Sequence, residues 1–275
     1  MTSWTEWIAM HALPLWGALL ATALLGGDLA WKYNVHWHQR ALSSGREPAV
    51  LRWHAGLLLI LAMALLFVTI ALAISISHSG TLTQFDARLA RSLHADMPLP
   101  ALRVVAVITD LGNALFIIPV AIVVLLALLL RRRHQLAGVW IFAMLGIIPI
   151  SSGLKAIFQR ARPLHNHGYI VEHSWSFPSG HAFGSIAFYG LLAYVLLREL
   201  PTRCHRPVIA ASVLLIGVVG CSRILLQVHY FSDVVAGYAS GACWLLLCMS
   251  IAEYLHAASR RRQIIRSHRT EAHRE

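Results

Sequence analysis

The chain has 275 residues, of which 57% are hydrophobic and only 13% are charged, and its mean hydropathy is positive. A composition this apolar excludes an ordinary water-soluble domain and places the chain in a lipid bilayer. The formal net charge of +11 does not indicate nucleic acid as a partner, because no basic stripe alternates with aromatic side chains that could stack on bases.

Seven apolar runs are candidates for crossing the hydrocarbon core, which takes about 20 mostly apolar residues. Every backbone amide and carbonyl must find a partner inside the membrane, so we expect these runs to be helices and the fold to be an all-α helix bundle. The runs cover residues 9–27, 54–77, 111–130, 136–154, 181–197, 207–222 and 232–252.

The first run stands apart from the other six, because the polar segment 28–53 follows it. We therefore expect an accessory transmembrane helix with its loop over 1–53, a membrane domain over 54–255 and a basic tail over 256–275. No Lys or Arg precedes the first run, which favours a retained anchor over a cleaved signal peptide.

The segment 78–110 contains a further helical pattern that ends before Pro98. Its apolar residues share one face and its charged residues are expected on the other faces; they are Leu82, Phe85, Leu89 and Leu93, and Asp86, Arg88 and Arg91. Two interpretations stay open, an amphipathic helix on the outer leaflet and a helix packed over the bundle.

Most of the 23 Lys and Arg residues fall on one side of the membrane when the loops are assigned to alternate sides. By the positive-inside rule this side is cytoplasmic, so we expect a multi-pass inner-membrane protein with its amino terminus outside and its carboxyl terminus inside. Anionic lipid head groups are a secondary partner of these charges. The four cysteines show neither a disulfide framework nor zinc spacing.

Three polar blocks fall on the outer side in this topology, and ionisable residues next to membrane spans are usually functional. The blocks are KAIFQRARP from Lys155 to Pro163, PSGH from Pro178 to His181, and SRILLQVHYFSD from Ser222 to Asp233. Arg160 and Asp110 are expected near the same pocket.

The cations of these blocks suit a phosphoryl group, whose transfer is catalysed largely by positioning and electrostatic stabilisation. Lys155, Arg162 and Arg223 supply positive charge, and guanidinium forks match phosphate oxygens in pairs. Ser179 and Gly180 open a span, where free backbone amides favour an anion.

The histidines of the blocks can carry the chemistry. His229 and Asp233 are four residues apart, so on a helix they share a face, and Asp233 can fix the imidazole tautomer for nucleophilic attack. His181 is then the expected general acid, protonating the leaving group and later taking a proton from water.

The chain resembles the type-2 phosphatidic acid phosphatase superfamily of lipid phosphate phosphatases over about residues 54–255. The resemblance rests on Lys155, Arg162 and Pro163, then Pro178 to His181, then Ser222, Arg223, His229 and Asp233, at the family's spacing. It implies a six-helix core and a metal-independent phosphomonoesterase or diphosphatase for lipid phosphates, without a cofactor. The implied catalytic residues are His229, His181 and Asp233, and the implied phosphate ligands are Lys155, Arg162, Ser179, Gly180 and Arg223. The seventh span departs from the family pattern.

Undecaprenyl diphosphate is the preferred substrate at this point, because an outward active site suits the recycling of a carrier lipid; phosphatidylglycerol phosphate and phosphatidic acid are alternatives. A head-group phosphotransferase using the same site, a transporter or scaffold, and a vanadium haloperoxidase are the rival interpretations. A metal site at His165, His167 and His173 is a minor alternative, because their spacing matches no usual ligand pattern.

Overall fold

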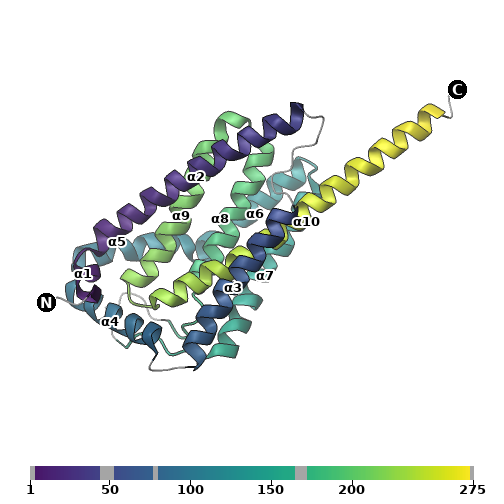
Figure 1. The fold of residues 1–275 in the computed structure, drawn as a ribbon. Helices are drawn as coiled ribbons and strands as arrows, with labels where there is room; N and C mark the ends of the chain where they lie inside the picture. Colours follow the sequence, from purple (N-terminus) through teal and green to yellow (C-terminus); the bar gives the residue numbers. More distant parts are fainter. Residues whose placement is uncertain (1–3, 44–52, 77–79, 165–171, 273–275) are drawn as a thin grey trace.

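The computed structural model describes residues 4–43, 53–76, 80–164 and 172–272, which form helices and short connections without a β-strand (Figure 1). This confirms the all-α prediction. In chain order the α-helices are α1 (Trp4–Met10), α2 (Ala12–Ser43), α3 (Trp53–Ile76), α4 (Thr81–Asp96), α5 (Leu99–Thr109), α6 (Ala114–Leu130), α7 (His134–Phe158), α8 (Gly180–Glu199), α9 (His205–Leu225) and α10 (Phe231–Ala272).

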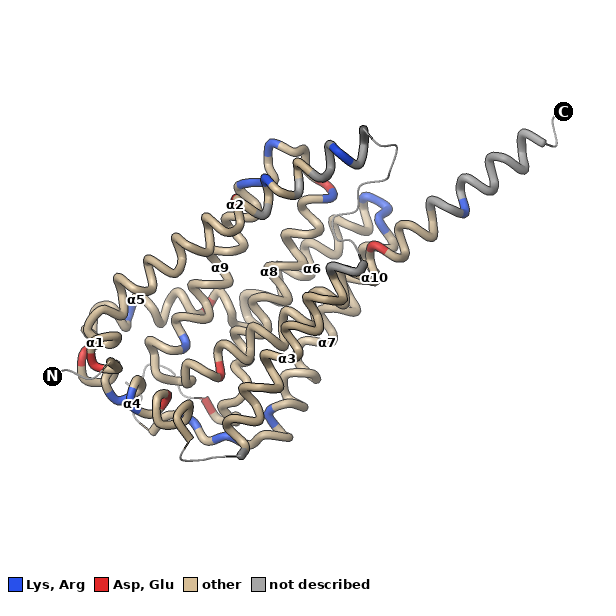
Figure 2. The backbone as a smooth tube through the Cα atoms, viewed as in Figure 1, with Lys and Arg blue, Asp and Glu red and all other residues tan. Residues whose placement is uncertain are grey.

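Seven segments of the described chain are long and apolar enough to cross a membrane, as the sequence predicts. The third differs in extent, because the 3-10 turn η1 (Asp110–Gly112) joins α5 to α6 and extends the apolar segment over Leu99–Leu130. Charged residues gather toward the two ends of the bundle and leave the middle of the helices uncharged (Figure 2). The last helix, α10, continues beyond the other helices toward the carboxyl terminus (Figure 1).

The helix α8 is the centre of the bundle. Of its membrane-spanning window 61% is buried inside the protein, compared with 0% for the window in α2. Trp140 of α7, Phe188 and Tyr194 of α8 and Cys248 of α10 lie in one buried apolar cluster. Burial of these large side chains on all sides of α8 fixes the positions of its neighbours α7, α9 and α10.

The helix α10 passes very close to the amino end of α8 because it carries small residues there. A Cβ atom on Gly237 would lie 2.6 Å from the carbonyl oxygen of Ser179, and one on Gly241 would lie 2.7 Å from that of Phe183. The backbone of Ser179 also donates its N–H to the carbonyl of Asp233 at 2.9 Å. These contacts place the starts of α8 and α10 side by side.

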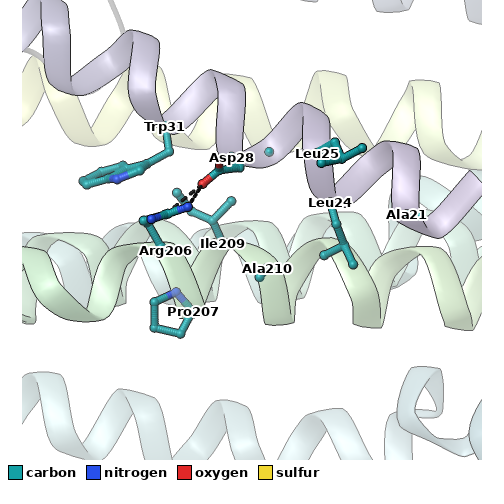
Figure 3. Close-up of a pocket in the computed structure, with 10 residues that line it drawn as sticks. Ala21, Leu24, Leu25, Asp28, Trp31, Arg206, Pro207, Ile209 and Ala210 are labelled. Carbon is teal, nitrogen blue, oxygen red and sulfur yellow. Dashed lines mark hydrogen bonds and ion pairs between the residues drawn. The ribbon is translucent and has the colours of Figure 1, made fainter.

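The accessory helix α2 lies along α9, at the edge of the bundle (Figure 1). Asp28 of α2 pairs with Arg206 at the start of α9, with 2.5 Å between the oxygen and the guanidinium nitrogen (Figure 3). A mostly apolar cavity of about 670 Å³ lies between the two helices, beside this ion pair. The division into domains at residues 53 and 255 stays a prediction.

The helix α4 packs over the bundle, which decides between the two interpretations of its sequence. Leu89 and Leu93 are buried against Leu102 of α5 and Leu225 of α9. The expectation for Asp86 was wrong, because its carboxyl is 1% exposed and points into the protein. The reason is the helical spacing itself: Asp86 is three residues before Leu89 and seven before Leu93, so it shares their buried face, where a cation from another part of the chain pairs with it.

Gly237→Ala is expected to destabilise the protein, because the added Cβ would meet backbone that cannot move without separating α10 from α8. Overpacking of this kind costs about 1–3 kcal/mol, so the midpoint of thermal unfolding in detergent should fall by several degrees. Gly138→Ala is the matched control, because no atom lies within 4 Å of its Cβ position. Equal midpoints for the two variants would contradict this account of the packing.

Candidate active site

The structure brings the three polar blocks to one end of the bundle. Each predicted residue sits where a helix starts or stops. Lys155 lies in the last turn of α7 and Arg223 in the last turn of α9, whereas Ser179 caps the start of α8. Gly180 and His181 open α8, Arg162 lies in the irregular segment after α7, and Asp233 lies in the first turn of α10.

His229 lies in the turn just before α10, and not on a helix with Asp233 as the four-residue spacing suggested. The turn is set by Gln227, which has a positive φ of 55°, and it carries the chain from α9 to α10. The imidazole nevertheless faces the carboxylate, with His229 Nδ1 3.5 Å from Asp233 Oδ2. Both side chains are buried, at 2% and 0% exposure.

The neighbours of His229 determine which ring nitrogen is free. An Nη atom of Arg162 lies 3.2 Å from Nε2, and a guanidinium can only donate, so Nε2 carries the lone pair and the proton is on Nδ1. Burial lowers the pKa of His229 to about 4, although Asp233 acts in the opposite direction. At neutral pH the imidazole is therefore uncharged, with its unprotonated nitrogen facing a cationic side chain.

Lys155 and Arg162 converge on one point in the segment before α8. The Lys155 ammonium donates to the hydroxyl of Ser174 at 2.8 Å, and Arg162 donates to the same hydroxyl at 3.1 Å. The Cβ position of Gly180 is 3.8 Å from Lys155 Nζ, so the ammonium lies close to the first amides of α8. The geometry suits a small anion held by both cations and by these backbone amides.

Arg223 is fully buried, yet its guanidinium is not fully paired. One Nη atom donates to the hydroxyl of Thr109 at 3.1 Å and the other to the carboxylate of Glu172. Among the described residues, the Arg223 Nε–H finds no acceptor. A buried donor without a partner is costly, so this N–H is available to an incoming oxygen.

Glu172 occupies the place among the cations that an anion would take. Its carboxylate contacts Arg223 and lies 3.6 Å from Arg162. Burial alone would raise the pKa of Glu172, but the two guanidinium groups outweigh burial and lower it. The carboxylate is therefore ionised at neutral pH and competes with any other anion for these two arginines.

His181 belongs to the same electrostatic cluster. Its ring interacts electrostatically with Arg223, His229 and Lys155. Gly112 of η1 lies against the ring, since a Cβ atom at that position would be 2.9 Å from His181 Cδ2. The general acid expected from the sequence is thus held at the pocket by close backbone contact.

Sequence reasoning assigned no role to three further residues that contact Asp233 or its partners. The Ser176 hydroxyl donates to Asp233 Oδ2 at 2.5 Å, and Arg160 donates to Asp233 Oδ1 at 2.5 Å. Arg160 in turn pairs with the buried Asp86 at 2.8 Å. Ser176 lies two residues before the PSGH block and Arg160 lies inside the first block, so their places in the sequence indicated that both could be near the site. The signal for Asp86 was its place on the apolar face of α4, three residues before Leu89.

The possible metal site cannot be assembled from the described residues. His165 and His167 lie outside them, and His173 is exposed. Among the residues that the structure describes, no three His, Cys, Asp or Glu side chains are grouped as ligands would be.

Comparison with known proteins gives one consistent family. Residues 135–257 match the model of the PAP2 superfamily. The chain is 29% identical over 137 residues to phosphatidylglycerophosphatase B of Bacillus subtilis, in a match covering 49% of this chain and 66% of that protein, just under two thirds of its length. It is 30% identical over 186 residues to the lipid A 1-phosphatase of Rhizobium johnstonii, in a match covering 59% of this chain and 71% of that protein.

A solved structure shares the fold. It is the crystal structure of a transmembrane PAP2-type phosphatidylglycerolphosphate phosphatase from Bacillus subtilis, with a TM-score of 0.64 and 25% sequence identity. The superposition covers 69% of this chain and 93% of that chain. The shared fold thus accounts for nearly all of the solved structure and leaves part of this chain outside it.

Glu172→Gln is expected to tighten the binding of orthophosphate about tenfold, because the variant removes a negative charge that competes for Arg223 and Arg162. Isothermal titration of the detergent-solubilised protein measures the dissociation constant. Asp96→Asn, an exposed carboxylate on α4, is the control and should leave the constant unchanged. Weaker binding in Glu172→Gln would show that the carboxylate supports the anion site instead of competing for it.

Proposed function

Because the chain belongs to the PAP2 superfamily, we propose that it hydrolyses a lipid mono- or diphosphate through a phosphohistidine formed on His229. By class the protein is a lipid phosphatase, which is a kind of phosphoric monoester hydrolase. It is a multi-pass membrane protein. The observation that supports the mechanism is the direction of His229. Its Nδ1 faces Asp233 and its Nε2 faces Arg162, so the nucleophilic atom points into the cationic pocket.

In the first step of the proposed reaction, His229 Nε2 attacks phosphorus and the bond to the leaving oxygen breaks. Lys155, Arg162 and Arg223 stabilise the charge that spreads over the three equatorial oxygens, and the amides at the start of α8 add to this effect. His181 gives its proton to the leaving alkoxide or phosphate. Asp233 stabilises the positive charge that develops on the imidazole.

In the second step water attacks the phosphorus of the phosphohistidine, and the P–N bond breaks. His181, now neutral, accepts the proton of this water, so that inorganic phosphate leaves and both histidines return to their initial states. The cations do the work that a metal ion does in other phosphatases, so the proposed reaction uses neither a metal nor a cofactor.

The substrate is proposed to be a lipid that presents its phosphate at the outer face of the inner membrane, with the carboxyl terminus of the protein in the cytoplasm. The charge bias of the loops supports this orientation. Undecaprenyl diphosphate remains a candidate because an outward site suits carrier-lipid recycling. The names of the relatives support phosphatidylglycerol phosphate and the 1-phosphate of lipid A.

His229→Ala is expected to lower kcat by about a thousandfold or more, because the variant lacks the nitrogen that forms the proposed covalent intermediate. The protein should still fold, since the core around α8 does not include His229. Phosphate release and size-exclusion elution are the two measurements. His134→Ala, an exposed histidine at the far end of α7, is the matched control. Turnover by a folded His229→Ala variant would exclude this nucleophile.

The substrate class is tested by phosphate release from four lipids and a water-soluble phosphate ester, each with EDTA present. The lipids are undecaprenyl diphosphate, phosphatidylglycerol phosphate, phosphatidic acid and lipid A. We expect rapid release from at least one lipid, slow release from the soluble ester and no effect of EDTA. Loss of activity in EDTA with recovery on adding a divalent cation would contradict the metal-free mechanism. Phosphate release that gives way to a phosphorylated acceptor lipid would show phosphotransfer.

A further inference from the structure

Arg160 contacts the carboxylate oxygen of Asp233 that does not face His229. One Nη atom donates to Asp233 Oδ1 at 2.5 Å and to the hydroxyl of Ser232 at 2.8 Å, while the other donates to Asp86 Oδ2 at 2.8 Å. The guanidinium carbon lies 4.3 Å from the ring centre of Tyr230, so an aromatic face covers the plane of the group. Arg160 is therefore held on all sides in one orientation.

Asp86 closes this arrangement from α4. It accepts the backbone N–H of Ser232 at 3.1 Å and also accepts the Ser232 hydroxyl. Ser232 is the second residue of α10, where backbone N–H groups have no partner inside the helix. Asp86 thus caps α10 from another helix, beside Asp233, which accepts the N–H of Tyr230 at 2.9 Å.

We propose that Asp86 and Arg160 are positioning residues for the catalytic pair, with Asp86 setting how much of the Arg160 charge reaches Asp233. This rests on the proposed function, since it assigns a role relative to the nucleophile His229. Neither residue touches the phosphate pocket formed by Lys155, Arg162 and Arg223. They act through Asp233 alone.

The charges explain why two carboxylates surround one guanidinium. If Arg160 paired with Asp233 alone, it would neutralise the carboxylate and leave little negative charge to stabilise a positive imidazole at His229. Asp86 takes a share of the Arg160 charge, so Asp233 keeps part of its own. Burial acts against a charged Arg160, but Asp233 and Asp86 outweigh burial and raise its pKa. Burial raises the pKa of Asp86, and Ser232 and Arg160 act in the opposite direction.

Other charged and titratable groups also face the catalytic pair. In the variants whose titrations are compared below, Arg160 is the only one of these groups that is substituted. Those interacting with His229 are Asp233, Arg162, Arg223, Glu172 and His181, and those interacting with Asp233 are Arg160, Lys155, Arg162, His229 and Tyr230. Of these groups, Arg160 and the neutral Tyr230 interact with Asp86. Substitution of Asp86 therefore changes the field at His229 chiefly through Arg160 and Asp233.

This role predicts shifts of opposite sign for two variants. Asp86→Asn removes negative charge, so it should destabilise the imidazolium and lower the pKa of His229. Arg160→Gln removes positive charge, so it should raise that pKa. Each shift should be about half a pH unit or more. Both variants should lower kcat about tenfold through misplacement of the imidazole, with little change in KM because the phosphate ligands are untouched.

The experiment is an NMR titration of the full-length protein in detergent with ¹³C-labelled histidine, in which the signal of His229 is identified by its absence from His229→Gln. Asp96→Asn and Arg91→Gln are the matched controls, since both residues are exposed on the same helix as Asp86. Arg160→Lys keeps the positive charge, and we expect it to restore the pKa of His229 toward that of the unaltered protein.

Opposite shifts, together with unchanged controls, would support the positioning role. A pKa of His229 that stays unchanged in both variants, or that moves in the same direction in both, would overturn it. Asp86→Asn should fold, because the introduced amide oxygen can still accept the Ser232 N–H. If this variant does not fold, the comparison of Arg160→Gln with Arg160→Lys decides alone. The titration needs no turnover, so opposite shifts without phosphate release from any lipid would reject the proposed reaction but not the positioning role.

Discussion

Two carboxylates share the free backbone amides at the amino end of α10, and the rest of the site is arranged around that buried pair. Asp86 accepts the N–H of Ser232 and Asp233 accepts the N–H of Tyr230. Two negative charges side by side in a protein interior would repel, and Arg160 is the cation that contacts both. The helix terminus, the two acids and Arg160 form one unit: removing Arg160 leaves two buried carboxylates without the cation between them, and removing either acid leaves a backbone amide without its acceptor.

The packing of α10 against α8 brings this unit to the phosphate pocket. Gly237 allows the backbones to meet, and the N–H of Ser179 bonds to the carbonyl of Asp233. The start of α8, where an anion is favoured, is thereby fixed beside the start of α10, where the proposed nucleophile His229 is oriented. A shift between the two helices would separate the imidazole of His229 from the proposed phosphate ligands, and the small residues at this contact keep the two helices close together.

The two sides of His229 have opposite electrostatic tasks. On the Nε2 side, arginines and a lysine surround the position of the reacting group, and Glu172 neutralises part of their charge. On the Nδ1 side, Asp233 and Ser176 hold the proton of the ring. The cationic and anionic regions together fix the tautomer of the neutral, buried imidazole. A histidine that attacks phosphorus through one nitrogen requires such a fixed tautomer.

The sequence by itself determined the class of fold and the seven apolar segments, and it predicted the polar residues that the structure gathers at one end of the bundle. Apolar runs indicate burial in a bilayer. Ionisable side chains next to a membrane are costly and usually functional, and this cost singled out Lys155, Arg162, His181, Arg223 and His229. The tertiary structure alone decided how Asp86, Ser176 and Glu172 take part, and it placed His229 in a turn instead of on α10. Their roles depend on contacts between segments far apart in the chain, and helical spacing describes only neighbours along one helix. The spacing of α4 places Asp86 on the same face as Leu89 and Leu93, but only the tertiary structure supplied its cation, Arg160, a partner 74 residues away in the sequence.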